Sequence, residues 1–262
     1  MVISRVNLIY FSPTDTTEKT VRAIASAFDC EKQEYDITLD RKITVPAFAA
    51  DELVIAGVPV YGGRVPALVE KFFQSLKASG TPAVVVGVYG NRHYDDALLE
   101  LADYLKTDGF TVCAAGAFIG EHSFGNEIAT GRPDTEDLIK AKGFGAEVKV
   151  KLDAAASIEA LAALEIPGNH PYKERSSAPN TAAPKTTDAC VKCGICVKNC
   201  PVGIIDPEDP SKITDVSKCQ RCFSCVKRCP VHAKYFDQEG VLGAMAFLKA
   251  KCSERREPEM FI

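Results

Sequence analysis

The sequence has 262 residues, of which 46% are hydrophobic and 25% are charged, and this composition is that of a globular protein with one or two domains. The net charge of −4 is too small to suggest a nucleic-acid or membrane partner. The charge is unevenly distributed. Residues 185–262 hold 13 basic and 10 acidic side chains, a net of +3, so the first 184 residues hold 18 and 25, a net of −7. The two parts are expected to attract each other, or the basic part to steer an acidic partner.

Eleven cysteines would indicate disulfides in a secreted chain, but eight of them fall within the forty residues 190–229. The first ten residues read as a buried strand rather than as the core of a secretion signal. No apolar run in the sequence is long enough to cross a membrane. We therefore expect a reducing, cytoplasmic location, in which thiols bind metal rather than one another.

Residues 1–165 alternate short apolar runs with helical patterns. Strands are predicted at residues 2–11, 31–37, 53–60, 83–89 and 111–118. Helices are predicted at residues 16–28, 95–106 and 134–151, the last with Asp134 as its N-terminal cap. This alternation predicts a doubly wound, five-stranded parallel sheet of the α/β class, in which ligands bind at the carboxyl ends of the strands. The loops at residues 12–17, 59–65 and 90–95 follow such ends.

The rest of the chain changes character after residue 165. Residues 166–185 are rich in Pro, Ser and Thr and lack apolar periodicity, so we expect a linker that lies on the surface. Residues 186–238 hold the eight clustered cysteines and form the second predicted domain. Residues 239–262 are expected to form a terminal helix and a tail.

The cysteine segment repeats itself with an offset of 29 residues, starting at Cys190 and again at Cys219. Each half reads C-x₂-C-x₂-C-x₃-C-P, a spacing that lets a tight loop follow the corners of an iron–sulfur cube. The fourth cysteine of each half is expected to bind the cluster of the other half. The predicted ligands of the first [4Fe–4S] cluster are Cys190, Cys193, Cys196 and Cys229. Those of the second cluster are Cys219, Cys222, Cys225 and Cys200.

Zinc and disulfides are the alternatives for these cysteines. Zinc sites usually pair two C-x₂-C units across a longer gap, whereas here three cysteines follow in one run. Residues 186–236 resemble the bacterial two-cluster ferredoxins, which implies a small α+β domain with two [4Fe–4S] clusters. Such ferredoxins are usually acidic, but this segment is basic around its motifs, at Lys192, Lys198, Lys227, Arg228 and Lys234. The other cysteines are predicted to be structural thiols, at positions 30, 113 and 252.

The three loops at the strand ends place a possible phosphate cradle and two aromatic loops at the same edge of the predicted sheet. The loop at residues 11–18 is crowded with hydroxyl groups before a helix, which favours phosphate binding, although the same residues could simply cap that helix. The loops at residues 57–66 and 88–96 each carry an aromatic residue beside glycine, which turn chemistry alone also explains.

Residues 1–150 resemble the flavodoxins, a family that binds FMN. The phosphate loop of the family, S-x-T-G-x-T, is matched from Ser12 to Thr17, with Asp15 where glycine is common. Its third loop, G-D-x-x-x-Y, is compared with Gly90 to Tyr94, which has one residue fewer before the tyrosine and Asn91 in place of aspartate. The resemblance implies that Tyr61 and Tyr94 lie against the two flavin faces and that backbone groups of residues 90–95 hold the pyrimidine edge. The implied FMN-binding residues are Ser12, Thr14, Asp15, Thr16, Thr17, Pro59, Val60, Tyr61, Gly62, Tyr89, Gly90, Asn91, Arg92, Tyr94 and Asp95.

A fourth loop, at residues 120–133, is long for a connection between a strand and a helix. Loops of this length are often functional lids, and His122, Ser123 and Arg132 could meet a substrate or a partner. A plain surface loop is the alternative.

Taken whole, the chain resembles the flavodoxin–ferredoxin fusion proteins of anaerobic bacteria and archaea. The resemblance implies electron transfer between FMN and two [4Fe–4S] clusters, within a chain or across a homodimer, together with redox partner proteins. An FMN-dependent reductase of a small molecule, fed by its own clusters, is the alternative. A third reading is a cluster-bearing structural or sensory protein that has lost FMN, and Asp15 is its support.

Overall fold

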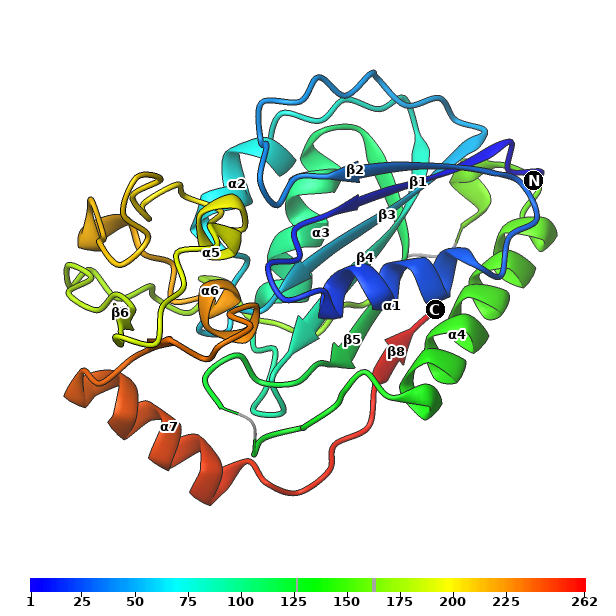
Figure 1. Ribbon diagram of the computed structural model, residues 1–262. Coiled ribbons are helices and arrows are strands. Elements are labelled where there is room, and N and C mark those ends of the chain that lie inside the picture. The colour runs from blue at the N-terminus through cyan, green and yellow to red at the C-terminus, as the bar shows by residue number, and fades with distance from the viewer. Residues whose placement is uncertain (126, 162–163) are drawn as a thin grey trace.

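A six-stranded sheet forms the centre of the computed structural model, which describes residues 1–125, 127–161 and 164–262 (Figure 1). The strand order is β2-β1-β3-β4-β5-β8. The first five strands are parallel, as predicted, and the order 2-1-3-4-5 is the flavodoxin-like form of the doubly wound sheet. These strands span Arg5–Tyr10 (β1), Glu31–Asp36 (β2), Glu52–Pro59 (β3), Thr81–Tyr89 (β4) and Phe110–Ile119 (β5).

Helices cover both faces of the sheet, so the central strands are buried on both sides. Helices α1 and α4 pack with one apolar core, and α2 and α3 pack with the other (Figure 1). All nine residues of β4 are buried, which is why the sequence there is continuously apolar rather than alternating. The helices span Thr16–Ala25 (α1), Ala67–Phe73 (α2), Ala97–Thr107 (α3) and Thr135–Ala154 (α4), and a 3₁₀ turn follows at Ile158–Ala160.

Two elements of the central sheet and its covering helices were absent from the sequence prediction. Helix α2 has only seven residues, too few for a helical period to stand out. Strand β8, Glu259–Phe261, lies at the end of the tail and pairs antiparallel with β5 as a sixth strand. Asp134, by contrast, caps α4 as predicted, because its side chain accepts a hydrogen bond from Asp137 N at 3.0 Å.

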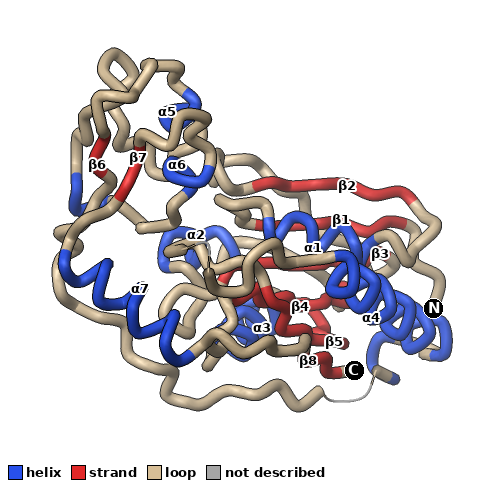
Figure 2. The backbone as a smooth tube through the Cα atoms, turned by 60° about the horizontal axis from the view of Figure 1, so that its bottom comes forward, coloured by secondary structure: helices blue, strands red, loops and turns tan. Residues whose placement is uncertain are grey.

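The cysteine segment is a small unit at the carboxyl ends of the parallel strands. Figure 2 shows α5, α6, β6 and β7 together at one end of the sheet, with α7 beside them. The two short strands pair antiparallel, Lys185 with Tyr235 and Thr186 with Lys234. The elements span Lys185–Thr186 (β6), Ile195–Lys198 (α5), Val216–Lys218 (a 3₁₀ turn), Ser224–Lys227 (α6), Lys234–Tyr235 (β7) and Glu239–Lys251 (α7).

The segment before β6 is bound to the surface of the flavodoxin-like domain beside α3. Lys173 N donates a hydrogen bond to Asp96 at 2.6 Å, and Arg175 donates to Glu100 at 2.8 Å. Glu100 is fully buried and also accepts from Arg64 at 2.7 Å and from Val65 N at 2.8 Å. One buried carboxylate therefore joins α3, the loop after β3 and the linker.

The pKa of Glu100 reports how well this carboxylate is satisfied. Burial acts to raise it, but the hydrogen bonds from Arg64, Tyr104 and Val65 N outweigh burial and lower the pKa below its ordinary value of 4.5. Because the pKa is lower in the folded chain, this stabilisation is present above about pH 4.5 and is lost as the pH falls through the folded value.

Replacing Glu100 by Ala is expected to lower the free energy of unfolding by about 3 kcal/mol, because it leaves the nearly buried guanidinium group of Arg64 without its carboxylate partner. Denaturant unfolding followed by circular dichroism measures the change. Arg5→Ala is the control: Arg5 is 42% exposed in its pairs with Glu31 and Glu52, so about 0–1 kcal/mol is expected. Equal losses in the two variants would contradict this account of the linker.

Candidate functional site

A cavity of about 820 Å³ lies between the flavodoxin-like domain and the cysteine segment. Its volume is within the range of about 300–1,000 Å³ typical of ligand pockets. The walls come from the three predicted loops, the loop after β5, the linker, the cysteine segment and α7. The predicted FMN-binding residues that line it are Thr14, Thr16, Pro59, Val60, Tyr61, Gly62, Tyr89, Gly90 and Arg92.

The first loop places hydroxyl groups at the N-terminus of α1, where backbone N–H groups lack partners within the helix. Ser12 Oγ accepts a hydrogen bond from Glu18 N at 3.0 Å, so this hydroxyl holds the helix start, as the capping alternative proposed. Thr17 Oγ1 is buried and has no hydrogen-bond partner among the described residues. A hydroxyl group without a hydrogen-bond partner, beside a helix N-terminus, is suited to bind a phosphate group.

Asp15 has a φ of 65°, a left-handed conformation that explains why glycine is common at this position of the pattern. Its carboxylate forms an ion pair with Arg228 of the cysteine segment. The negative charge is therefore neutralised by a cation from the other domain.

The second loop is a tight turn that presents Tyr61 to the cavity. Two backbone hydrogen bonds close the turn: Tyr61 N donates to Arg64 O at 3.0 Å, and Arg64 N donates to Tyr61 O at 3.2 Å. Between these residues, Gly62 and Gly63 take φ values of 62° and 88°. Burial raises the pKa of Tyr61, and the thiols of Cys222 and Cys219 add to the effect. Tyr61 also lines the same cavity as Cys219, a predicted ligand of the second cluster.

The third loop reaches the cavity only in part. Gly90 and Arg92 line it, but Tyr94 is 2% exposed, donates from its hydroxyl to Glu259 at 2.8 Å and stacks on His93 with ring centres 4.7 Å apart. The structure thus places Tyr94 in the protein interior instead of against a flavin face. The predicted residues that are not among the described residues lining the cavity are Ser12, Asp15, Thr17, Asn91, Tyr94 and Asp95.

The fourth loop contributes an aromatic ring that the resemblance did not place. His122 and Ser123 line the cavity, and a Cβ atom on Gly90 would lie 2.3 Å from His122 Cδ2, so the imidazole packs directly on the third loop. Burial, with Lys227 and Arg92 nearby, lowers the pKa of His122 to about 4. Phe124 N donates to His122 Nδ1 at 3.1 Å, so the proton of the neutral ring is on Nε2. His122 is thus a hydrogen-bond donor at the cavity wall.

Arg132, the third residue singled out in this loop, does not reach the cavity among the described residues. It is 5% exposed, forms an ion pair with Asp137, and donates to Arg256 O at 2.6 Å. Arg132 therefore holds the C-terminal tail, and it has no position from which to meet a substrate.

The eight motif cysteines surround two separate hollows. One hollow is lined by Cys190, Cys193, Cys196 and Cys229, and the other by Cys200, Cys219, Cys222 and Cys225. These are the two crossed ligand sets expected from the motif. All eleven cysteines are free thiols, and within the described residues no three His, Cys, Asp or Glu side chains converge closely enough for one metal ion. Thiols spread around a hollow suit a cube rather than a single zinc ion.

The backbone repeats along with the motif. Positive φ values occur three times in each half, at positions that are 29 residues apart. The pairs are Lys192 (52°) and Arg221 (50°), Gly194 (74°) and Phe223 (59°), and Gly203 (62°) and His232 (52°). These turns wrap the chain around each hollow. Burial raises the pKa of the Cys222 thiol to about 12, so its thiolate requires a cationic partner such as iron.

Phe223, like His232, is a bulky residue that stands where the other half of the repeat has glycine. A left-handed conformation costs such a residue roughly 1–3 kcal/mol, so surrounding contacts must hold it. Phe223 stacks on Phe236 at 4.2 Å and contacts Phe124 at 4.9 Å, measured between ring centres. Phe223 lines the second hollow and Phe124 lines the large cavity, so this contact connects the two.

Basic residues of the cysteine segment meet acidic and carbonyl groups of the flavodoxin-like domain. Lys227 forms an ion pair with Glu121, next to the pair between Arg228 and Asp15. In the opposite direction, Arg41 of the flavodoxin-like domain donates to Pro201 O of the cysteine segment at 2.8 Å. The attraction expected from the uneven charge is therefore observed within one chain.

Residues 177–234 match the family model described as a 4Fe-4S dicluster domain. The cysteine segment is a two-cluster [4Fe–4S] domain. The family match and the crossed hollows confirm the prediction of two [4Fe–4S] clusters, and with them an electron-transfer role. A search of curated proteins found no match.

Solved structures similar to the amino-terminal part include three flavodoxins. A flavodoxin from the domain Archaea is 16% identical, covers 57% of this chain and 99% of its own, and has a TM-score of 0.43. A short-chain flavodoxin associated with a bacterial microcompartment is 18% identical, covers 57% of this chain and 99% of its own, and has a TM-score of 0.41. Oxidised Flavodoxin 2 from Bacillus cereus is 16% identical, covers 56% of this chain and 99% of its own, and has a TM-score of 0.41. The strand order, rather than these similarities, carries the fold assignment. Among the described residues, no helix is both long and apolar enough to span a membrane.

Crossed ligation can be tested with paired substitutions in the two-cluster domain. Cys200→Ala together with Cys222→Ala removes two ligands of one cluster, so about four of about eight irons should remain. Cys200→Ala together with Cys196→Ala affects both clusters and should remove nearly all iron. Iron analysis and EPR after anaerobic reconstitution give the result. The reverse pattern would show that each half binds its own cluster.

Proposed function

We propose that this protein passes electrons between FMN, bound in the large cavity, and its two [4Fe–4S] clusters. Phosphate donors at the start of α1, Tyr61 and the glycine-rich second loop lie on one side of the cavity. His122, Gly90 and Arg92 form another side. These groups suit the phosphate and the ring of a flavin.

One observation carries the proposal: Cys219, a ligand of the second cluster, lines the same cavity as Thr16 and Tyr61. A bound flavin and the second cluster would therefore be neighbours within one chain. Among the described residues, none that lines the first hollow also lines this cavity, and Cys193, a predicted ligand of the first cluster, is exposed. We infer the order FMN, second cluster, first cluster, with external redox partners served at the first cluster.

The protein's own residues supply position, hydrogen bonds and local charge. FMN can hold one or two electrons, whereas each cluster passes one. Neutral His122 offers its Nε2 proton as a hydrogen-bond donor at the wall, and Arg92 adds a positive charge nearby. A cation and a donor at this place would favour the reduced flavin and raise its potential.

The reading in which the chain has lost FMN rests on Asp15, whose charge would repel a phosphate. The ion pair with Arg228 offsets that charge, and this supports FMN binding. We also propose that the protein acts in the reducing cytoplasm of an anaerobic cell, where free thiols and clusters persist.

Reduction of a small molecule is the second candidate function, and the extent of the cavity favours it. Beyond the flavin loops the cavity continues to Arg221 and to apolar residues of α7, including Ala244 and Phe247. A carrier has no need of this space. Oxidation of the reduced protein by small-molecule acceptors, followed anaerobically, distinguishes an enzyme from a carrier.

Anaerobic purification should give one FMN for about eight irons. After rapid reduction of the clusters, the flavin should be reduced at a rate independent of protein concentration, because both groups share one chain. Stopped-flow absorbance measures this rate. A chain with full iron and no affinity for FMN would refute the proposal.

The proposed order of FMN and the two clusters can be tested with two variants, each of which removes one predicted cluster ligand. Cys193→Ala removes a ligand of the first cluster and should leave transfer between the second cluster and flavin intact. Cys222→Ala removes a ligand of the second cluster and should slow flavin reduction at least about tenfold, since the first cluster is farther away. The opposite ranking would place the first cluster next to the flavin.

A further inference from the structure

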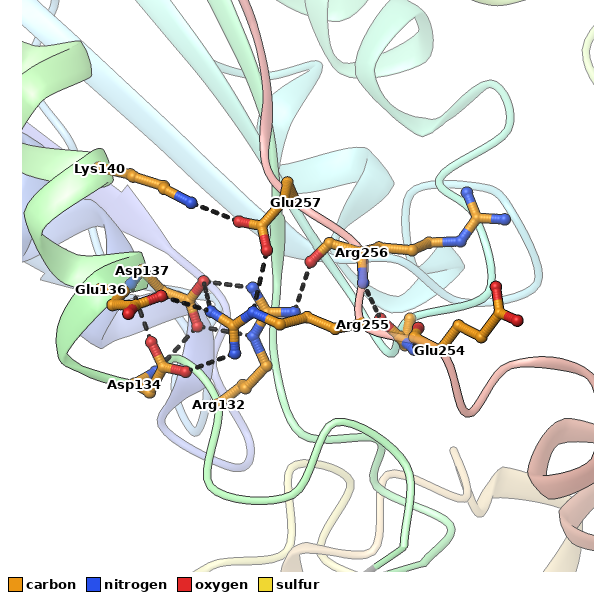
Figure 3. A network of polar contacts seen from close by, with 10 residues as sticks. Arg132, Asp134, Glu136, Asp137, Lys140, Glu254, Arg255, Arg256 and Glu257 are labelled. Carbon is orange, nitrogen blue, oxygen red and sulfur yellow. Dashed lines mark hydrogen bonds and ion pairs between the residues drawn. The ribbon is translucent and has the colours of Figure 1, made fainter.

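The C-terminal tail returns from α7 to the flavodoxin-like domain and is held there along its length (Figure 3). Arg132 donates to Arg256 O at 2.6 Å, and Arg255 pairs with Asp134 at 2.7 Å. The tail then pairs with β5 as strand β8. These contacts place the tail beside the third loop of the cavity.

Asn91 is the residue of that loop that binds the tail. Its side chain is 1% exposed, and its φ is 63°. Asn91 Nδ2 donates to Cys252 O at 2.6 Å and to Glu254 O at 2.7 Å, and Arg256 N donates to Asn91 Oδ1 at 3.3 Å. One buried amide therefore uses both its donor and its acceptor groups on the tail.

Two walls of the cavity meet at this amide. Gly90 and Arg92, on either side of Asn91, line the cavity from the third loop. Cys252 ends α7, whose residues Ala244 and Leu248 line the cavity from the opposite wall. Moving Asn91 would therefore shift the flavin loop and α7 relative to each other.

We propose that Asn91 is a positioning residue that joins the third loop to the tail and α7, so that FMN affinity depends on a C-terminal segment remote from the flavin. The inference rests on the proposed function. It also explains why asparagine replaces the aspartate of the flavodoxin pattern. A carboxylate has no N–H group to donate and would face the carbonyl oxygens of Cys252 and Glu254.

The test compares full-length, cluster-loaded variants. Asn91→Asp keeps the shape of the side chain but loses both donated hydrogen bonds, and Asn91→Ala loses all three. Each should weaken FMN binding about tenfold, measured by quenching of flavin fluorescence, and should speed amide hydrogen exchange in residues 252–261. Lys249→Gln is the control, because Lys249 is 63% exposed on α7 and pairs with Glu127, which is equally exposed. It should change FMN affinity less than about twofold.

A chain ending at residue 251 provides a second variant in case Asn91 substitutions impair folding. It keeps Asn91 but removes both carbonyl groups together with β8 and the other contacts of the tail, so it should bind FMN at least as weakly as Asn91→Ala. Adding Asn91→Ala to the shortened chain should cause no further loss, because Asn91 has already lost its partners there. Additive losses, or Asn91→Asp with normal FMN affinity and normal exchange of the tail, would overturn the inference. Failure of the unaltered chain to bind FMN would refute the proposed function, while hydrogen exchange would still test the attachment of the tail.

Discussion

The attachment of the two-cluster domain at both of its ends is the constraint on which the rest of the structure depends. Before the domain, Arg175 binds buried Glu100 and Lys173 N binds Asp96. After it, strand β8 joins the sheet beside β5. A domain held at one end could move over the range of its linker, whereas one held at both ends keeps a narrow set of positions. The cavity between the domains exists because this placement is fixed.

Polar and apolar contacts contribute differently to the contact between domains. The ion pairs of Arg228 and Lys227 are partly exposed, and such pairs add little free energy. They fix orientation instead, since they join defined loops. The apolar cluster around Phe223, Val241 and Phe236, with Phe124 from the other domain, is buried and supplies the hydrophobic part of the contact. Phe223 keeps a left-handed backbone conformation in this cluster, where its packing holds it.

Local patterns predicted most of the fold and one half of the site. The apolar runs of the central strands and the spacing of the cysteines are properties of short segments, so the parallel sheet and the crossed cysteine sets could be read directly. Residues whose roles depend on distant partners could not. Tyr94 turns inward to meet Glu259, and His122 reaches the cavity by packing on Gly90. The two departures from the flavodoxin pattern, Asp15 and Asn91, are both contacts with the C-terminal part of the chain.

The distance along the chain between β5 and β8 has a consequence for biosynthesis. The ribosome completes β5 at Ile119 roughly 140 residues before it reaches Glu259, so the five parallel strands can fold first. The sixth strand can pair with β5 only after Glu259–Phe261 has left the ribosome. Until then α7 and the cluster loops are not fixed over the strand ends, and the side of the cavity that they close is open. The order of the elements along the chain therefore lets the parallel sheet form before the contacts that hold this side of the cavity are available.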